Sequence, residues 1–203
     1  MPTTTLTRSQ QKRAAIVDAA MEEFKASGFH ATSMDTIAAR AKVSKRTVYN
    51  HFESKDSLFT EISQASCDAV MDMMEIEFDP GRPVDEQLAE FAAAMIDLCC
   101  SEKFMTMAQV TLPERVRNPG LANPGFDRIR RGENGMARWL EQAIDAGVLD
   151  VVDAAVASRQ FIALILEFAL WPQLIGGEKL PDAAQRRNII ASAVNLFLNG
   201  SRK

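Results

Sequence analysis

The sequence predicts an all-α protein of about nine helices, on three observations. Apolar residues recur at three- and four-residue spacing through most of the 203 residues, which is the pattern of amphipathic helices. Clusters of Gly, Pro and Asn interrupt this pattern and mark short connections. No stretch shows the alternation of apolar and polar residues that is typical of a half-buried strand. The hydrophobic content of 47% is ample for a core.

Charge and cysteine content narrow the class of protein. Residues 1–60 carry nine Lys/Arg and six Asp/Glu, whereas residues 61–203 carry fourteen and twenty-one, so an acidic chain has a basic N-terminal end. Cys67, Cys99 and Cys100 lack the spacing of a metal site or a disulfide framework. The longest apolar run, Phe161–Trp171, is shorter than the ~20 residues of a membrane helix. We therefore expect a cytoplasmic protein whose basic end meets nucleic acid.

The first expected helix runs from about Ser9 to Ser27. Ile16, Ala20 and Phe24 lie on one face of it, and Gly28 follows at the position where a left-handed residue ends a helix. We expect this apolar face to cover the two short helices that follow.

The segment Thr32–Lys55 predicts two short helices joined by a tight turn. Thr32 or Ser33 can cap the first helix, and Ser44 can cap the second, which spans about Lys45–His51. A pair of this kind is a helix-turn-helix.

The second of these short helices presents mostly polar side chains. Val48 is its only aliphatic anchor, and the other side chains are left to face outward: Lys45, Arg46, Thr47, Tyr49, Asn50 and His51. Cations can contact phosphate or guanine, and hydroxyl, amide and imidazole groups can contact phosphate or base edges. The pattern predicts a helix that enters the major groove of DNA.

The residues of this region resemble the DNA-binding domain of TetR-family transcriptional regulators. The resemblance is carried by VSKRTVYNHFESKDSLF at residues 43–59 and by GFHATSMDTIAARA at residues 28–41. It implies a DNA-binding domain over residues 1–55 and a helical effector-binding and dimerisation domain over residues 56–203. Carried over by position, it implies DNA contacts by Lys45, Arg46, Thr47, Tyr49, Asn50 and His51, with phosphates held at the edges by Ser33 and Lys55.

Two positions depart from the family pattern. Lys42 stands where Gly is usual in the turn, and a left-handed conformation there costs a non-Gly residue about 1 kcal/mol. Arg46 stands where Gly is often found in the reading helix, and its forked donor could contact either a guanine or a phosphate.

Six further helices are expected downstream. Their approximate ranges are Ser54–Phe78, Asp85–Ser101, Glu102–Val116, Phe126–Ala146, Ala154–Trp171 and Pro181–Leu198, and all but the second end near Gly, Pro or Asn. The first of these would begin in the DNA-binding domain and continue beyond it. It is therefore the expected coupling element.

Methionine and aromatic residues concentrate between Val70 and Leu140, which hold seven of the ten methionines. Such residues are either ordinary core or the lining of an adaptable pocket for a small apolar molecule. The candidate pocket residues are Met71, Met74, Phe78, Phe91, Met95, Phe104, Met107, Met136 and Trp139.

The last two expected helices are apolar over wide arcs, with Glu167 as an isolated charge. A helix of this kind is either buried in one subunit or meets a partner. We expect a homodimer with a four-helix interface, as in most members of the family that the chain resembles. The candidate interface residues are Phe161, Leu164, Phe168, Trp171, Ile190, Val194 and Phe197.

The sequence thus predicts a homodimeric regulator, in most such proteins a repressor, that binds a palindromic operator and is released by a small apolar effector. The C-terminal half loosely resembles the AefR-like group. No catalytic motif, metal-spaced cluster or phosphate loop is present, so we expect no enzyme, cofactor or metal. The alternatives are an effector-independent repressor or activator, and a small-molecule binding protein with a vestigial DNA-binding domain.

Overall fold

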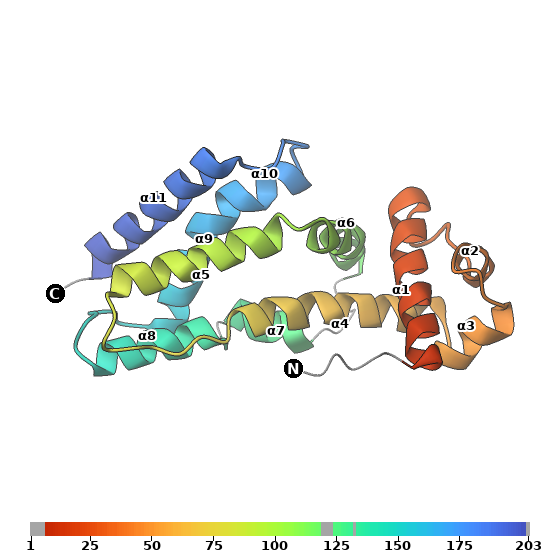
Figure 1. Ribbon diagram of the computed structural model, residues 1–203, viewed down its shortest axis with the longest axis horizontal. Coiled ribbons are helices and arrows are strands. Elements are labelled where there is room, and N and C mark those ends of the chain that lie inside the picture. The colour runs from red at the N-terminus through yellow and green to blue at the C-terminus, as the bar shows by residue number, and fades with distance from the viewer. Residues whose placement is uncertain (1–6, 119–123, 132, 202–203) are drawn as a thin grey trace. The chain divides into compact units, whose positions relative to one another are not determined.

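The structure is a computed structural model that describes residues 7–118, 124–131 and 133–201 (Figure 1). These residues form eleven α-helices and contain no strand, which confirms the predicted all-α class. The helices are α1 (Arg8–Ser27), α2 (Met34–Arg40), α3 (Lys45–His51), α4 (Lys55–Met73), α5 (Val84–Cys99), α6 (Glu102–Arg117), α7 (Pro124–Arg131), α8 (Gly135–Asp145), α9 (Ala154–Ala169), α10 (Trp171–Leu174) and α11 (Ala183–Ser201).

More helices are present than predicted because two of the expected helices are divided. The side chain of Asn134 accepts a hydrogen bond from the backbone N–H of Ala137 at 3.0 Å, which starts α8 as a helix separate from α7. Farther on, α9 ends at Ala169, and α10 begins with Pro172 in its first turn. Proline is tolerated there because its missing N–H has no helical partner in the first turn.

The end of α4 also differs from the prediction, since the helix stops at Met73 and not at Phe78. Side-chain amides take over the backbone hydrogen bonds in the segment that follows. Gln142 accepts from the N–H of Phe78 at 3.1 Å, and Gln87 accepts from the N–H of Asp79 at 3.0 Å. The ring of Phe78 meets the ring of Trp139 edge-on at 5.4 Å. This segment is held by packing and by side-chain acceptors, which helical periodicity does not reveal.

The chain divides into two compact units. The first unit comprises residues 1–66 and 106–123, and the second comprises residues 67–105 and 124–203. Helix α4 begins in the first unit and ends in the second, whereas α6 begins in the second unit and ends in the first. The sequence-based division at residue 55 assigned all of α6 to the second domain, whereas most of this helix belongs to the first compact unit. Assignment of separate functions to the two parts stays a prediction.

The first unit packs α1 against α2, α3 and the start of α4. Ile16 and Ile37 are fully buried, and Phe24, Phe29 and Phe59 form a ring cluster with centroid separations of 5.0–6.3 Å. Gly28 ends α1 with φ of 81°, in the region that glycine adopts without steric cost. The predicted first helix and its covering role are both present.

The second unit is built around α5, α8, α9 and α11 (Figure 1). Trp139 and Phe161 are buried at its centre, and the ring of Phe161 packs on Phe91 at 6.0 Å and on Phe197 at 5.0 Å. All three cysteines are buried and none of them forms a disulfide bond, and burial raises the pKa of the Cys99 thiol to about 12. No helix among the described residues is long and apolar enough to cross a membrane.

Gly135 allows the segment after α4 to approach the start of α8. A Cβ atom at this position would lie 1.9 Å from the carbonyl oxygen of Met74 and 2.9 Å from the Cα of Glu75. Both contacts are with backbone, which cannot rotate away as a side chain can. An ion pair between Arg138 on α8 and Glu75 also links the segment after α4 to α8.

We expect Gly135→Ala to lower the free energy of unfolding by about 3 kcal/mol, because the new methyl group overlaps backbone. Gly200→Ala is the matched control, since Gly200 also lies in a helix and a Cβ there meets nothing within 4 Å. The control should keep or raise stability by up to about 1 kcal/mol. Chemical denaturation of both variants measures the difference, and equal stabilities would contradict the proposed backbone approach.

Candidate nucleic-acid interface

The connection between α2 and α3 is a tight turn held by backbone hydrogen bonds. Ala41 N–H donates to the carbonyl of Ile37 at 2.9 Å, and Val43 N–H donates to the carbonyl of Ala38 at 3.1 Å. Lys42 lies between them with φ of 54° and is the only non-glycine residue with positive φ in the described part of the chain. The expected left-handed turn is therefore present, and a lysine occupies it.

Ser44 caps α3 as the sequence predicted, and of the two candidate caps Thr32 and Ser33 it is Ser33 that caps α2. Ser33 accepts from the N–H of Thr36 at 3.1 Å and Ser44 from the N–H of Thr47 at 3.1 Å. The hydroxyl groups of Ser44 and Thr47 also lie 2.8 Å apart. Ser33 remains exposed at the start of α2, where the helix N-terminus favours an anion.

Helix α3 is anchored on one side and open on the other. Val48 is fully buried and Phe52, which follows the helix, is 4% exposed. Among the polar side chains of α3, those of Lys45, Arg46, Tyr49 and Asn50 are exposed. Those of Thr47 and His51 are half-buried. A single apolar anchor therefore leaves nearly the whole helix surface to face a ligand. Its cations, hydroxyl groups, amide and imidazole are the groups that contact DNA phosphates and base edges.

Lys45 and Arg46 differ in their surroundings. The Nζ of Lys45 lies 2.8 Å from the carboxylate of Asp35 on α2. Hydrogen bonding and charge attraction from Asp35 raise the pKa of the Lys45 ammonium, which therefore stays protonated. Arg46 has no ion pair within the part of the chain that the structure describes. Of the two cations on α3, the guanidinium of Arg46 is therefore the one without a carboxylate partner among the described residues.

Lys55 lies at the start of α4 but does not present a free cation. Its ammonium group donates to the carbonyl oxygens of Phe29, His30 and Thr32 at 2.7, 3.1 and 2.9 Å, and it stands 4.6 Å from the centre of the Phe29 ring. An ammonium group has three protons, and all three are directed to carbonyl oxygens. The expectation that Lys55 holds a DNA phosphate is therefore not supported, because its donors are used inside the first unit.

The structure places the candidate pocket residues mainly in close-packed core. Met107 lies in the first unit, and the others lie in the second. Phe91 and Trp139 line a hollow of about 330 Å³ beside the segment after α4, together with Met73 and Ile76. Arg82 and Glu90 form an ion pair at 2.5 Å on its rim. Only these two members of the predicted set border this hollow.

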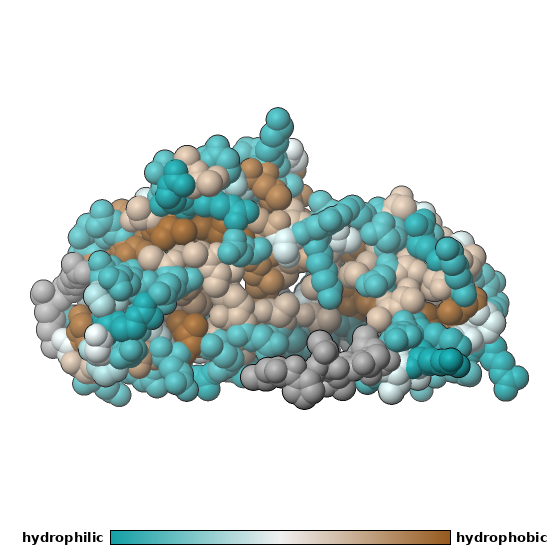
Figure 2. All heavy atoms as spheres, viewed as in Figure 1, coloured by the Kyte–Doolittle hydropathy of each residue, from teal (hydrophilic) through white to brown (hydrophobic). Residues whose placement is uncertain are grey.

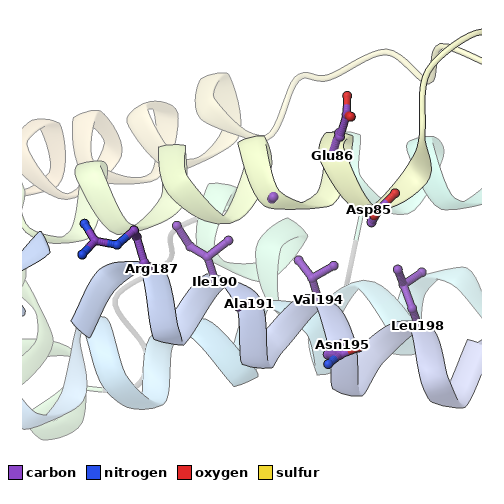
Figure 3. Close-up of a pocket in the computed structure, with 9 residues that line it drawn as sticks. Asp85, Glu86, Arg187, Ile190, Ala191, Val194, Asn195 and Leu198 are labelled. Atoms are coloured by element: carbon purple, nitrogen blue, oxygen red, sulfur yellow. The ribbon is translucent and has the colours of Figure 1, made fainter. Parts of the chain in front are cut away.

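The candidate interface residues divide into three groups. Phe161 and Phe197 are core residues of one unit, and this burial corrects the expectation that they form an interface. Ile190 and Val194 line a groove of about 440 Å³ between α5 and α11, which Figure 3 shows with Arg187 toward one end and Asp85 toward the other. Figure 2 shows hydrophobic surface along the boundary between these two helices. Leu164 is half-buried, and Phe168 and Trp171 are exposed.

Comparison with known proteins decides the family. Residues 16–62 match the model described as bacterial regulatory proteins of the tetR family. Residues 86–200, more than half of the chain, match the C-terminal domain of AefR-like transcriptional repressors. The chain belongs to the TetR family of transcriptional regulators. This membership confirms both parts of the resemblance seen in the sequence, together with the prediction that the protein is not an enzyme.

Solved TetR-family structures match the chain over nearly its whole length. A TetR-family regulator from Pseudomonas syringae pv. tomato str. DC3000 is 36% identical, with a TM-score of 0.81 over 97% of this chain and 99% of that one. The flavonoid-responsive regulator FrrA is 28% identical, with a TM-score of 0.72 over 94% and 97% of the two chains.

A relative found by its sequence is the transcriptional activator FasR of Mycolicibacterium smegmatis. It is 28% identical over 156 residues, or 71% of each chain.

Proposed function

We propose that this TetR-family regulator is a homodimeric repressor that binds a palindromic operator and is released by a small apolar effector. The observation that carries the proposal is the open face of α3, where Arg46, Tyr49 and Asn50 are exposed above the buried Val48. A helix with this distribution fits the major groove. The match to AefR-like repressors favours repression over activation.

In the proposed complex α3 enters the major groove and α2 crosses the DNA backbone. Arg46, Tyr49, Asn50 and His51 reach base edges or phosphates, and Thr47 can meet a thymine methyl group. Ser33 and the N-terminus of α2 hold a phosphate. Lys45 approaches the DNA with Asp35 beside it, and this carboxylate offsets part of its attraction to phosphate.

The proposed dimer interface is the exposed apolar surface of α9, α10 and α11. Phe168 and Leu196 are 55% and 60% exposed, and Ile175, which follows α10, is 79% exposed. Phe168 and Ile189 line one hollow, so the end of α9 lies beside α11. Large apolar side chains gathered in this way mark an interaction surface. Leu164, Phe168, Trp171 and Ile190 of the predicted set remain available to it, and Ile175 and Leu196 join them.

The proposed effector site is the hollow lined by Phe91 and Trp139. Its volume of about 330 Å³ is within the range of small-molecule sites, and its lining combines aromatic and aliphatic side chains with a charged rim. FrrA responds to flavonoids, which shows that an effector-responsive regulator shares this fold at 28% identity. Release requires that the effector bind the off-DNA conformation more tightly than the DNA-bound one.

Three other functions remain as rivals: activation in place of repression, regulation without an effector, and small-molecule binding without recognition of DNA. FasR is an activator and is 28% identical to this chain, so an activating role is the first rival. A regulator without an effector would keep the DNA interface, and its hollow would bind nothing. A small-molecule binding protein with a vestigial DNA-binding domain would not select a DNA sequence.

Selection of bound sequences from a random duplex pool, at roughly physiological salt, tests the DNA-binding function. We expect enrichment of an inverted repeat whose half-sites lie about one helical turn, ~34 Å, apart. Arg46→Gln should relax the sequence preference if Arg46 reads a base, and should weaken binding to all sequences alike if it contacts a phosphate. Failure of the wild-type protein to enrich any sequence would contradict the proposed function.

Leu196→Glu tests the dimer interface. A buried, unpaired carboxylate in an apolar interface is strongly unfavourable, so we expect the variant to sediment as a monomer. Val116→Glu is the matched control, because Val116 is an 80% exposed valine on α6 outside the proposed interface. Analytical ultracentrifugation distinguishes the two. A Leu196→Glu protein that remains dimeric would place the interface elsewhere.

Tryptophan fluorescence tests the effector site, because the chain has only two tryptophans. Trp171→Phe leaves Trp139, which borders the hollow, as the single reporter. We expect small apolar molecules that bind to change this signal and to release the selected operator over the same concentration range. Phe91→Ala, which alters the lining, should weaken both effects together. Operator release with no change in Trp139 emission would move the effector to another site.

A further inference from the structure

We propose that Lys55 and Glu114 are positioning residues that set operator affinity without touching DNA. Both act on the connector between α1 and α2, which we define as Phe29–Thr32. Lys55 holds this connector from α4 and Glu114 holds it from α6. The inference rests on the proposed DNA-binding function and gives that function a means of control.

Lys55 holds the backbone of the connector. Its three donors reach three of the four connector carbonyls, those of Phe29, His30 and Thr32, at 2.7–3.1 Å. Its ammonium group also lies 4.6 Å from the Phe29 ring centre, at the distance of a cation–π contact. Hydrogen bonds from a charged donor are stronger than those between neutral groups. The connector is therefore fixed to the first residue of α4.

The convergence of these three carbonyls suits an ammonium group in particular. The three N–H bonds of lysine spread from one atom, whereas the donors of arginine lie in one plane on a larger group. An arginine at this position would keep the charge but could not direct donors to the same three oxygens. Charge and geometry can thus be separated by one substitution.

Glu114 on α6 contacts a side chain of the same connector. It is 2% exposed, and its carboxylate lies 3.0 Å from the Nε2 of His30. The side-chain amide of Asn118 donates to the same carboxylate oxygen at 2.7 Å. A carboxylate that is nearly fully buried requires such partners, because desolvation is otherwise costly. Glu114 therefore links α6 to His30 of the connector.

Movement of the connector passes directly to the DNA-contacting helices. Thr32 is the residue before the Ser33 cap of α2, and its hydroxyl donates to the carbonyl of Gly28 at 2.9 Å. The connector is therefore rigid between the end of α1 and the start of α2. A displacement of Thr32 must carry α2 with it, and α3 follows because the turn around Lys42 joins the two helices tightly.

The two helices that hold the connector are the two that belong to both compact units. Helix α4 begins at Lys55 in the first unit and ends in the second, and α6 begins in the second unit and carries Glu114 near its end in the first. Any change in the second unit that shifts either helix along its axis acts on the connector. Lys55 and Glu114 are the contacts through which that shift reaches α2.

The test compares Lys55→Arg and Lys55→Gln on the duplex enriched by selection and on a random duplex. Binding is measured over a range of salt concentrations, at a temperature where circular dichroism shows every variant fully folded. We expect both variants to lose operator affinity by about tenfold, with random-duplex affinity and the salt slope unchanged. His30→Ala, which removes an exposed partner of Glu114, should lower operator affinity in the same selective way.

Two results would overturn the inference while leaving the proposed function intact. If Lys55→Arg binds like the wild type and Lys55→Gln lowers the salt slope by ~1, Lys55 is a phosphate contact. If the folded variants all keep wild-type operator affinity, the connector contacts only stabilise the fold. Failure to enrich any operator is a different outcome, because it rejects the proposed function itself.

Discussion

The seven-residue length of α2 and α3 is the constraint on which the DNA-binding face depends. Isolated helices this short are not stable in water, because nucleation is costly and few hydrogen bonds follow it. Their stability must come from outside: each serine cap accepts from one of the free N–H groups at its helix start, and Ile37 and Val48 are fully buried against their neighbours. Because one valine anchors α3, the rest of its surface is free to contact DNA.

The same constraint explains why three basic side chains of this unit make different contacts. Arg46 is exposed, Lys45 is paired with Asp35, and Lys55 is directed inward to three carbonyl oxygens. A short helix pair needs its orientation fixed by neighbouring elements, and the carbonyl groups of the connector between α1 and α2 need hydrogen-bond donors. Lys55 meets both needs. A basic residue in a DNA-binding motif is therefore not by itself evidence of a phosphate contact.

The second unit shows how far composition can indicate a binding site. Its methionine and aromatic residues are largely packed core, because a unit of four main helices must fill its own centre before it can leave a hollow. The remaining space borders Phe91 and Trp139, next to the extended segment after α4. That segment depends on Gly135 and on the side chains of Gln87 and Gln142. Packing details that are invisible in a hydrophobicity pattern thus set the shape of the hollow.

The sequence by itself determined the helical class, the cap at Ser44, the strained turn at Lys42 and the outward face of α3. All of these follow from local rules, since caps, turns and helix faces depend on residues within a few positions of one another. The tertiary structure alone decided that Ser33 and not Thr32 caps α2, which carbonyl groups Lys55 contacts, the burial of Phe161 and Phe197, and the exposure of Ile175 and Leu196. These depend on which distant groups converge on a side chain. Lys55 has carbonyl partners 23 to 26 residues away, and no spacing rule in the sequence reports such a meeting.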